Sequence, residues 1–195
     1  MSTFLFTVIP PILILSFFIL TDKFKEPKTT IITVFFLGFL ICLPAGILNQ
    51  LSHDFFFTGT DYSENLTGSF LGPAWAEELL KFSILYLIIL KRDEFNEPMD
   101  GLVYGVVVSL GFATYENYTY VYEWASTVAK EENLDFLEFS YLVAKGRSYS
   151  AIPMHGLNGA VMGYYFGLYA FSGNKNYLAL SLILPYLFHG FYNFL

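Results

Sequence analysis

Long blocks of apolar residues alternate with short polar and charged segments along the 195-residue chain. The blocks reach the roughly 20 residues that a helix needs to cross a hydrocarbon core about 30 Å thick. They predict six membrane-spanning helices, at residues 3–20, 29–51, 69–90, 99–122, 148–172 and 177–195. Helices are expected because unpaired backbone groups are not tolerated in lipid. The predicted fold class is therefore an all-α, polytopic membrane helical bundle, a single integral membrane domain over residues 1–195.

The connectors between these spans differ in their content of Lys and Arg. Six lie in alternate connectors that share one side of the membrane: Lys23, Lys25, Lys28, Lys91, Arg92 and Lys175. The opposite side has three, all in its longest connector: Lys130, Lys145 and Arg147. Because cytoplasmic loops are the richer in Lys and Arg, both termini are predicted to face outward. The block at 3–20 lacks a basic segment before it and a cleavage site after it, so we expect a retained span rather than a signal peptide.

The longest connector, residues 123–147, is acidic at first and then apolar. This pattern is compatible with an interfacial or re-entrant helix. An ordinary amphipathic loop is the alternative.

Composition supports the membrane assignment and excludes some functions. Charged residues make up 14% of the chain, whereas soluble domains carry about 25%. The net charge of −7 argues against a nucleic-acid partner, which requires a basic face. The single cysteine, Cys42, cannot form an internal disulfide.

Four of the predicted spans contain the polar side chains of a candidate site. They are Glu77, Glu78 and Lys81 in the third span, Glu116 and Asn117 in the fourth, His155 in the fifth, and His189 and Asn193 in the sixth. An ionisable group at the centre of a membrane helix costs about 2.5–3.5 kcal/mol on insertion scales. Such groups must therefore face the bundle interior, a partner or water. Each of them taken singly has a structural explanation, such as an ion pair or a packed histidine.

Their depth in the membrane favours a common site. Successive spans run in opposite directions, so depths can be compared at a rise of about 1.5 Å per residue from the outer end of each span. Glu77 then lies about 12 Å deep and Glu116 about 9 Å deep. His155 lies about 10 Å deep and His189 about 9 Å deep. The four side chains are expected at one level, in the half of the bilayer nearer the termini.

Small residues predict which helix faces meet. They recur every four positions in the fourth span (Gly101, Gly105, Ser109, Ala113) and in the fifth (Gly159, Gly163, Gly167). Such stripes allow two helix backbones to approach closely. The polar groups lie at the end of each stripe, so they are expected to point into a contact between helices.

Helical phase divides the polar groups of the third span. Glu77 and Lys81 are expected to share one face, and Glu78 to be turned about 100° away. Pro73, in the preceding turn, frees a backbone carbonyl and is expected to loosen the helix and admit water.

These residue types fit a hydrolase that activates water. A carboxylate can take a proton from water, and histidine or asparagine can donate to a developing oxyanion. Alternatively, Glu77, Glu116, His155 and His189 could hold a zinc ion whose fourth position is a water. The sequence has no HExxH, GxSxG or membrane GxGD pattern. It therefore leaves these two schemes open.

Four motifs resemble those of the PrsW family of intramembrane proteases, in the wider superfamily of CAAX-processing proteases and the APH-1 scaffold. They are Glu77-Glu78-x-x-Lys81, Phe112-x-x-x-Glu116-Asn117, the run from Arg147 to His155 and on to Gly163-Tyr164, and His189-x-x-x-Asn193. They occur in family order. The resemblance implies a PrsW-like catalytic core at residues 69–195, with residues 1–51 as two accessory spans. CAAX-type relatives carry arginine after the paired glutamates and FxxxH in the second motif, so the lysine and Glu116-Asn117 favour the PrsW branch.

The expected function is an intramembrane endopeptidase that hydrolyses a membrane-anchored protein with glutamate-activated water. Glu77 is the expected general base, with Glu78 and Lys81 in support and Glu116 positioning the water or sharing its proton. His155, or His189 with Asn193, is expected to stabilise the oxyanion. No cofactor is expected in this scheme, with zinc as the alternative.

The resemblance implies a single-pass or lipid-anchored membrane protein as substrate, such as an anti-sigma factor, and a prokaryotic cell membrane as the location. Three other functions remain open. The chain could be a non-catalytic scaffold of APH-1 type or a CAAX-type prenyl-protein protease. It could also be a proton- or ion-coupled carrier, although the inner halves of the spans are almost wholly apolar.

Overall fold

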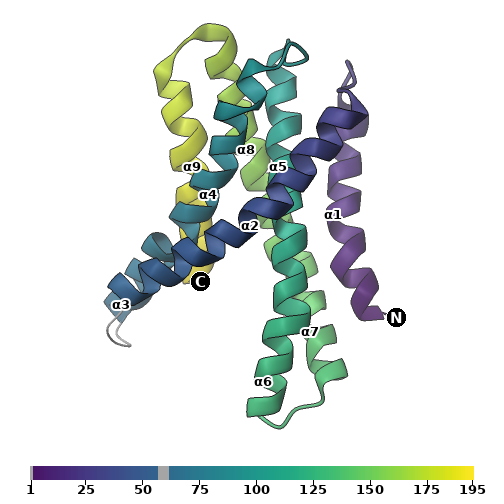
Figure 1. Cartoon of the computed structure of the whole chain (residues 1–195), viewed down its shortest axis with the longest axis vertical. Helices are drawn as coiled ribbons and strands as arrows, with labels where there is room; N and C mark the ends of the chain where they lie inside the picture. The colour runs from purple at the N-terminus through teal and green to yellow at the C-terminus, as the bar shows by residue number, and fades with distance from the viewer. Residues whose placement is uncertain (1, 57–61) are drawn as a thin grey trace.

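The computed structural model describes the backbone of residues 2–56 and 62–195. It describes the side chains of residues 3–55 and 66–195. The long helices are α1 (Ser2–Thr21), α2 (Lys28–Phe56), α4 (Trp75–Leu87), α5 (Pro98–Tyr118), α8 (Ala151–Ser172) and α9 (Lys175–Phe194). Shorter helices join them: α3 (Tyr62–Ser69), the π-helix η1 (Phe70–Ala74), the 3-10 helix η2 (Ile89–Lys91), the π-helix η3 (Thr119–Trp124), α6 (Ala125–Glu131) and α7 (Phe136–Tyr149). No strand occurs in these residues. The predicted all-α bundle is confirmed (Figure 1).

The predicted spans correspond to α1, α2, η1 with α4, α5, α8 and α9. The main differences lie around the predicted connector at 52–68. There α2 continues to Phe56 and α3 begins at Tyr62, so the ends of this connector are helical. Residues 57–61 of the connector lie outside the part of the chain that is described.

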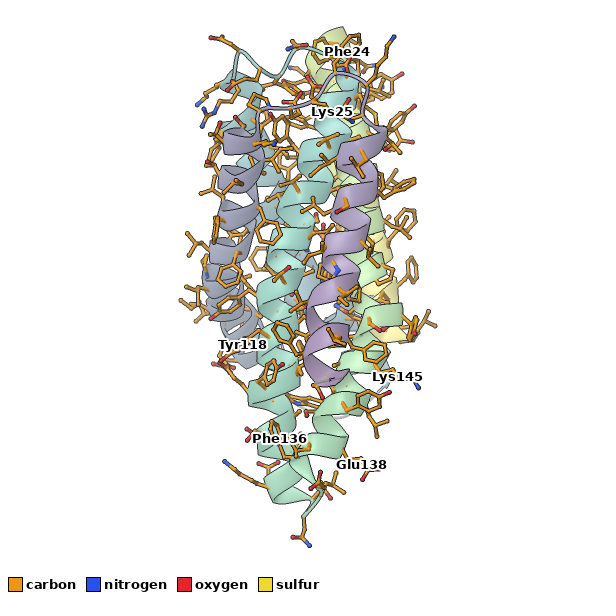
Figure 2. All side chains as sticks on the ribbon, turned by 90° about the vertical axis from the view of Figure 1, so that its right-hand side faces the viewer. Phe24, Lys25, Tyr118, Phe136, Glu138 and Lys145 are labelled. Carbon is orange, nitrogen blue, oxygen red and sulfur yellow. The ribbon has the colours of Figure 1, made fainter. Side chains whose placement is uncertain are left out.

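Successive long helices run in opposite directions (Figure 1). The basic connectors therefore share one end of the bundle, and both termini point toward the other. Figure 2 shows Phe24 and Lys25 near the first end, and Phe136 and Glu138 near the opposite end. The Lys25 ammonium donates to the carbonyls of Ile19 and Leu20 at 2.7 and 2.8 Å. It thereby satisfies acceptors that the last turn of α1 leaves unpaired.

Two helices among the described residues are long and apolar enough by composition to cross a membrane, at Thr3–Thr21 and Lys28–Phe55. Most of their surface is not covered by the rest of the bundle. Large side chains such as Phe17 and Leu20 are 60% and 73% exposed. Such an uncovered apolar surface suits contact with lipid.

Helix α5 lies at the centre of the bundle and contacts α1, α2, α4 and α8. Its residues from Val103 to Ala113 are all buried, which explains why its sequence is apolar on every side. The core between α2, α4, α5 and α8 contains Val34, Leu85, Val107 and Phe166. This central helix ends at the polar residues Glu116 and Asn117.

The predicted stripes of small residues meet at the interface between α5 and α8. A Cβ placed on Gly105 would lie 2.8 Å from the Cα of Gly163, and one on Gly101 would lie 2.8 Å from the Cα of Gly167. Real carbon atoms do not approach so closely. The two backbones can therefore touch only because glycine occupies these positions, as the spacing predicted.

The segment 123–147 forms a helical hairpin. Helix α6 continues from α5 through the π-helical turn η3, and α7 returns beside it to α8. Asp135 caps α7 by accepting a hydrogen bond from the amide of Glu138 at 2.8 Å. The hairpin follows the long axis of the bundle (Figure 1). An interfacial position of this segment in a membrane stays a prediction.

Candidate active site

The first polar residues of the site stand in the first turn of α4, directly after a break in the helix. Gly72 leaves the helical conformation, with φ −83° and ψ −120°. Pro73 follows it and has no amide hydrogen to donate. The break separates η1 from α4, and Glu77 and Glu78 follow it on α4. The loosening that Pro73 predicted is therefore seen at this turn.

Glu78 contacts both Lys81 and His189. Its Oε1 accepts a hydrogen bond from the Lys81 ammonium at 2.8 Å, and the same oxygen lies 2.8 Å from Nδ1 of His189 on α9. Lys81 lies farther from Glu77, at 3.7 Å. The expectation that Glu78 is turned away from Lys81 was therefore wrong, because residues three apart on a helix are neighbours as much as residues four apart.

His155 links α8 to two other helices. Its Nδ1 lies 3.1 Å from the Lys81 ammonium, and its Nε2 lies 3.1 Å from Oε2 of Glu116 on α5. The rings of His155 and His189 meet edge to face with centroids 5.2 Å apart. Lys81 also lies over the ring of Phe112, 4.2 Å from its centroid. Such cation–π contact stabilises a buried ammonium.

Glu116 is held in place from the hairpin. Arg147, on α7, donates from its guanidinium to Oε2 of Glu116 and, at 2.9 Å, to Oδ1 of Asn117. Asn117 in turn donates to the backbone carbonyl of Thr7 on α1 at 3.0 Å. Asn117 therefore contacts Arg147 rather than the histidines. Its position is that of a brace between α1, α5 and α7.

Glu77 is buried and faces both a histidine and a pocket. Its Oε2 lies 3.9 Å from Nε2 of His189. Within the described residues this Oε2 has no hydrogen-bond partner. One ligand atom each from Glu77, His155 and His189 lies within 4.8 Å of the others. A buried carboxylate oxygen without a hydrogen bond is costly. The Lys81 ammonium, 3.7 Å from this Oε2, offsets part of that cost, and a metal ion in direct contact would offset more.

The donor set also fits a metal. One carboxylate and two imidazoles are the ligands of one common type of catalytic zinc site. The Nδ1 of His189 is occupied by Glu78, and a carboxylate at that position orients a metal-binding imidazole and fixes its tautomer. Of the four predicted metal ligands, Glu116 is outside this group of three and contacts His155 instead.

A pocket of about 280 Å³ gives access to the site. Glu77 and Glu116 both line it, together with Asn49 of α2. The Nδ2 of Asn49 donates to Oε1 of Glu77 at 3.5 Å. Asn193 lies outside the cluster: it is exposed and lines a second pocket, which adjoins the first. Of the eight predicted site residues, six thus meet in one contact network, Asn117 braces it and Asn193 lies at a distance.

The comparisons with known proteins agree on one family. The model of the "PrsW family intramembrane metalloprotease" matches residues 26–195. The chain belongs to the PrsW family of intramembrane metalloproteases. It is 33% identical to the Protease PrsW of Clostridioides difficile (strain 630) over 202 residues, covering 100% of this chain and 79% of that protein. It is 33% identical to the Protease PrsW of Bacillus subtilis (strain 168), covering 96% and 79%, and 32% identical to that of Geobacillus kaustophilus (strain HTA426), covering 96% and 76%. No solved structure matches the chain.

Membership in the PrsW family makes this chain an integral membrane protein and a protease whose substrate is a membrane protein. It also corrects one prediction. We expected no cofactor, but the family is one of metalloproteases. Zinc was only the alternative, because the sequence has no HExxH motif to indicate a metal. That motif places both histidines on one helix, whereas here they come from α8 and α9.

Two residues of the site were missed as functional residues. Asn49 lies on α2, in the region predicted to be accessory, yet α2 falls within the PrsW match. The polar pair Asn49 and Gln50 near the end of an apolar span was the available signal. Arg147 was noted only as the start of a motif, since the sequence placed it in a connector. Its contact with Glu116 depends on the path of the hairpin, which residue spacing does not reveal.

Proposed function

We propose that this PrsW-family protein is an endopeptidase that cleaves membrane-anchored proteins with water activated by a glutamate. The observation that carries the proposal is the pairing of two carboxylates, Glu77 and Glu116, on the wall of one pocket beside two buried histidines. A site that must activate water needs a proton acceptor and an electrophilic group that face the same space.

The metal that the family implies would be held by Glu77, His155 and His189. When bound, it would polarise the peptide carbonyl and acidify a water molecule. Glu78 would orient the His189 ring through Nδ1, and Lys81 would compensate the negative charge of both glutamates. In this proposal Glu77 faces the pocket, and Glu78 supports a histidine from the side away from the pocket.

Glu116 is then the candidate proton acceptor, in place of Glu77. Its contacts with Arg147 and His155 both use Oε2, so we propose Oε1 as the atom that takes the proton from water. The same carboxyl would return the proton to the leaving amine. Arg147 would keep Glu116 at this position while Glu116 takes the proton from the water that attacks the peptide carbonyl.

The proposed substrate is a single-pass or lipid-anchored membrane protein, such as an anti-sigma factor. The basic connectors favour a cytoplasmic position for their end of the bundle, so both termini would face outward. The site would then lie in the outer half of the bilayer. The expected cleavage site is a peptide bond a short distance inside the outer membrane surface.

The test is a mass-spectrometric comparison of membrane-protein fragments from cells that produce the wild-type chain, Glu77→Gln or Glu116→Gln. Fragments present with the wild type should disappear with both variants. Glu131→Gln, at an exposed position on the hairpin, is the matched control and should leave the fragments unchanged. Identical fragments in wild type and both site variants, all folded, would refute the proposal.

A further inference from the structure

A polar groove leads from the surface to the site. It has a volume of about 550 Å³, and Gly46, Asn49, Gln50, Pro73, Tyr120 and Asn193 are among the residues that line it. We call it the access groove. Gly46, Asn49, Pro73 and Tyr120 also line the inner pocket that reaches Glu77 and Glu116. The two spaces therefore share a wall and form one path to the carboxylates.

We propose that the access groove binds an unwound, extended stretch of the substrate and delivers it to Glu77 and Glu116. This inference rests on the proposed function. It adds a route and a substrate requirement: the cleaved protein must have a segment that leaves the helical state near the end of its membrane span. Proteins whose span ends in glycine, proline or polar residues on the side of this chain's termini would be preferred.

The volume of the groove limits its occupant to a few residues, and the reach of those residues favours an extended one. A helix about 10 Å across occupies roughly 400 Å³ for each turn of 5.4 Å. The groove of about 550 Å³ would hold little more than one such turn. An extended chain advances about 3.3 Å per residue against about 1.5 Å in a helix, so the same few residues reach farther along the path toward the inner pocket.

The chemistry of the lining supports the same occupant. A helix in lipid pairs its backbone groups internally and needs no polar partner. An unwound stretch exposes its amides and carbonyls, and each needs a hydrogen-bond partner once the stretch is buried in the groove. The amide side chains of Asn49, Gln50 and Asn193 offer both donors and acceptors along the groove. The helix break at Gly72 lies in the same wall, so the groove borders backbone that is itself not regular helix.

Gly46 offers a direct test because it faces open space. A Cβ built on Gly46 meets no atom within 4 Å, so a larger side chain would fit without moving α2 and would fill the groove. Gly146, on α7, has equally open surroundings and lies outside the groove. The experiment compares Gly46→Phe with Gly146→Phe, using the host cell's own membrane proteins as the probe.

The expected result for Gly46→Phe is a fall of at least about tenfold, equivalent to about 1.4 kcal/mol of transition-state stabilisation, in all fragments that depend on Glu77. Gly146→Phe should leave these fragments unchanged. Undiminished fragments in Gly46→Phe would overturn the groove as the route while leaving the proposed function intact. Equal fragments in wild type and Glu77→Gln would overturn the proposed function, and the groove's role with it.

A second measurement tests the groove without relying on catalysis. In a Cys42→Ala background, Gly46→Cys in vesicles should react with a membrane-impermeant maleimide, because a groove open to the surface would admit the reagent from water. Ile47→Cys is the control: Ile47 is exposed on the bundle surface within an apolar span, so lipid should shield it. Labelling of position 46 at least tenfold faster than position 47 supports the groove. Labelling of position 46 that is absent, or no faster than that of position 47, would show that the groove is closed to water and would overturn the proposal.

Discussion

The close approach of α5 and α8 should control activity through the distance between Glu116 and His155. In the Gly159→Ala variant the added methyl would lie 2.7 Å from the Cβ of Ser109. Ordinary contact between carbon atoms needs about 3.5–4.0 Å, so the helices must separate by about 1 Å at this turn. His155 stands one turn away on α8, and its Nε2 is 3.1 Å from Glu116.

A displacement of about 1 Å at a catalytic group can reduce a rate by about 100-fold, and overpacking should lower the free energy of unfolding by about 1–3 kcal/mol. The assay is the cleavage rate, in vesicles, of the parent protein of one Glu77-dependent fragment. Denaturation by SDS in mixed micelles gives the change in stability. Gly146→Ala, in open space, is the control. Cleavage by Gly159→Ala within twofold of that control would refute the argument that this contact positions the site.

Three further predictions concern charged groups. Lys81→Met should lower the free energy of unfolding by about 3–5 kcal/mol, because Glu78 is left buried without its cation; adding Glu78→Gln should recover part of that loss in SDS denaturation, and strictly additive losses would contradict the pairing. Arg147→Lys keeps the charge but cannot contact Glu116 and Asn117 together, so the cleavage rate should fall about 10- to 100-fold while Tm changes little. A wild-type cleavage rate in this variant would show that Glu116 does not depend on Arg147 for its position. Burial raises the pKa of Glu26, in the connector after α1, from 4.5 to about 7. Because the folded chain then holds a proton that the unfolded chain has lost, stability should fall as pH rises from about 4.5 to about 7 and level off above that. Glu26→Gln should flatten this slope, and an unchanged slope would contradict it.

Much of the fold could be predicted because a membrane imposes simple rules. The six main helical segments followed from apolar length. The contact between α5 and α8 followed from the four-residue repeat of glycine that ends near Glu116 and His155. The paths of α3 and of the hairpin could not be predicted in the same way. Their sequences carry no strong period, and their positions depend on contacts with distant helices such as α1 and α9.

The sequence predicted the depth of the site in the membrane but not the contacts between its side chains. Depth counting brought Glu77, Glu116, His155 and His189 to one place without any knowledge of helix rotation. Which side chains contact one another depends on the rotation of each helix about its axis. This explains why Glu78 was assigned to the wrong face of α4. Asn193 was grouped with His189 because the two are four residues apart on one helix. At the end of α9 that face opens into the access groove rather than the cluster.

The content of bound metal tests the central claim most directly, that Glu77, His155 and His189 form one metal-binding centre. Elemental analysis of the purified wild-type protein should find close to one divalent metal ion per chain. Glu77→Gln, His155→Ala and His189→Ala should each lose most of it, and Asn193→Ala, at the exposed end of α9, should keep it. Full metal content in the three site variants, or none in the wild type, would contradict the assignment.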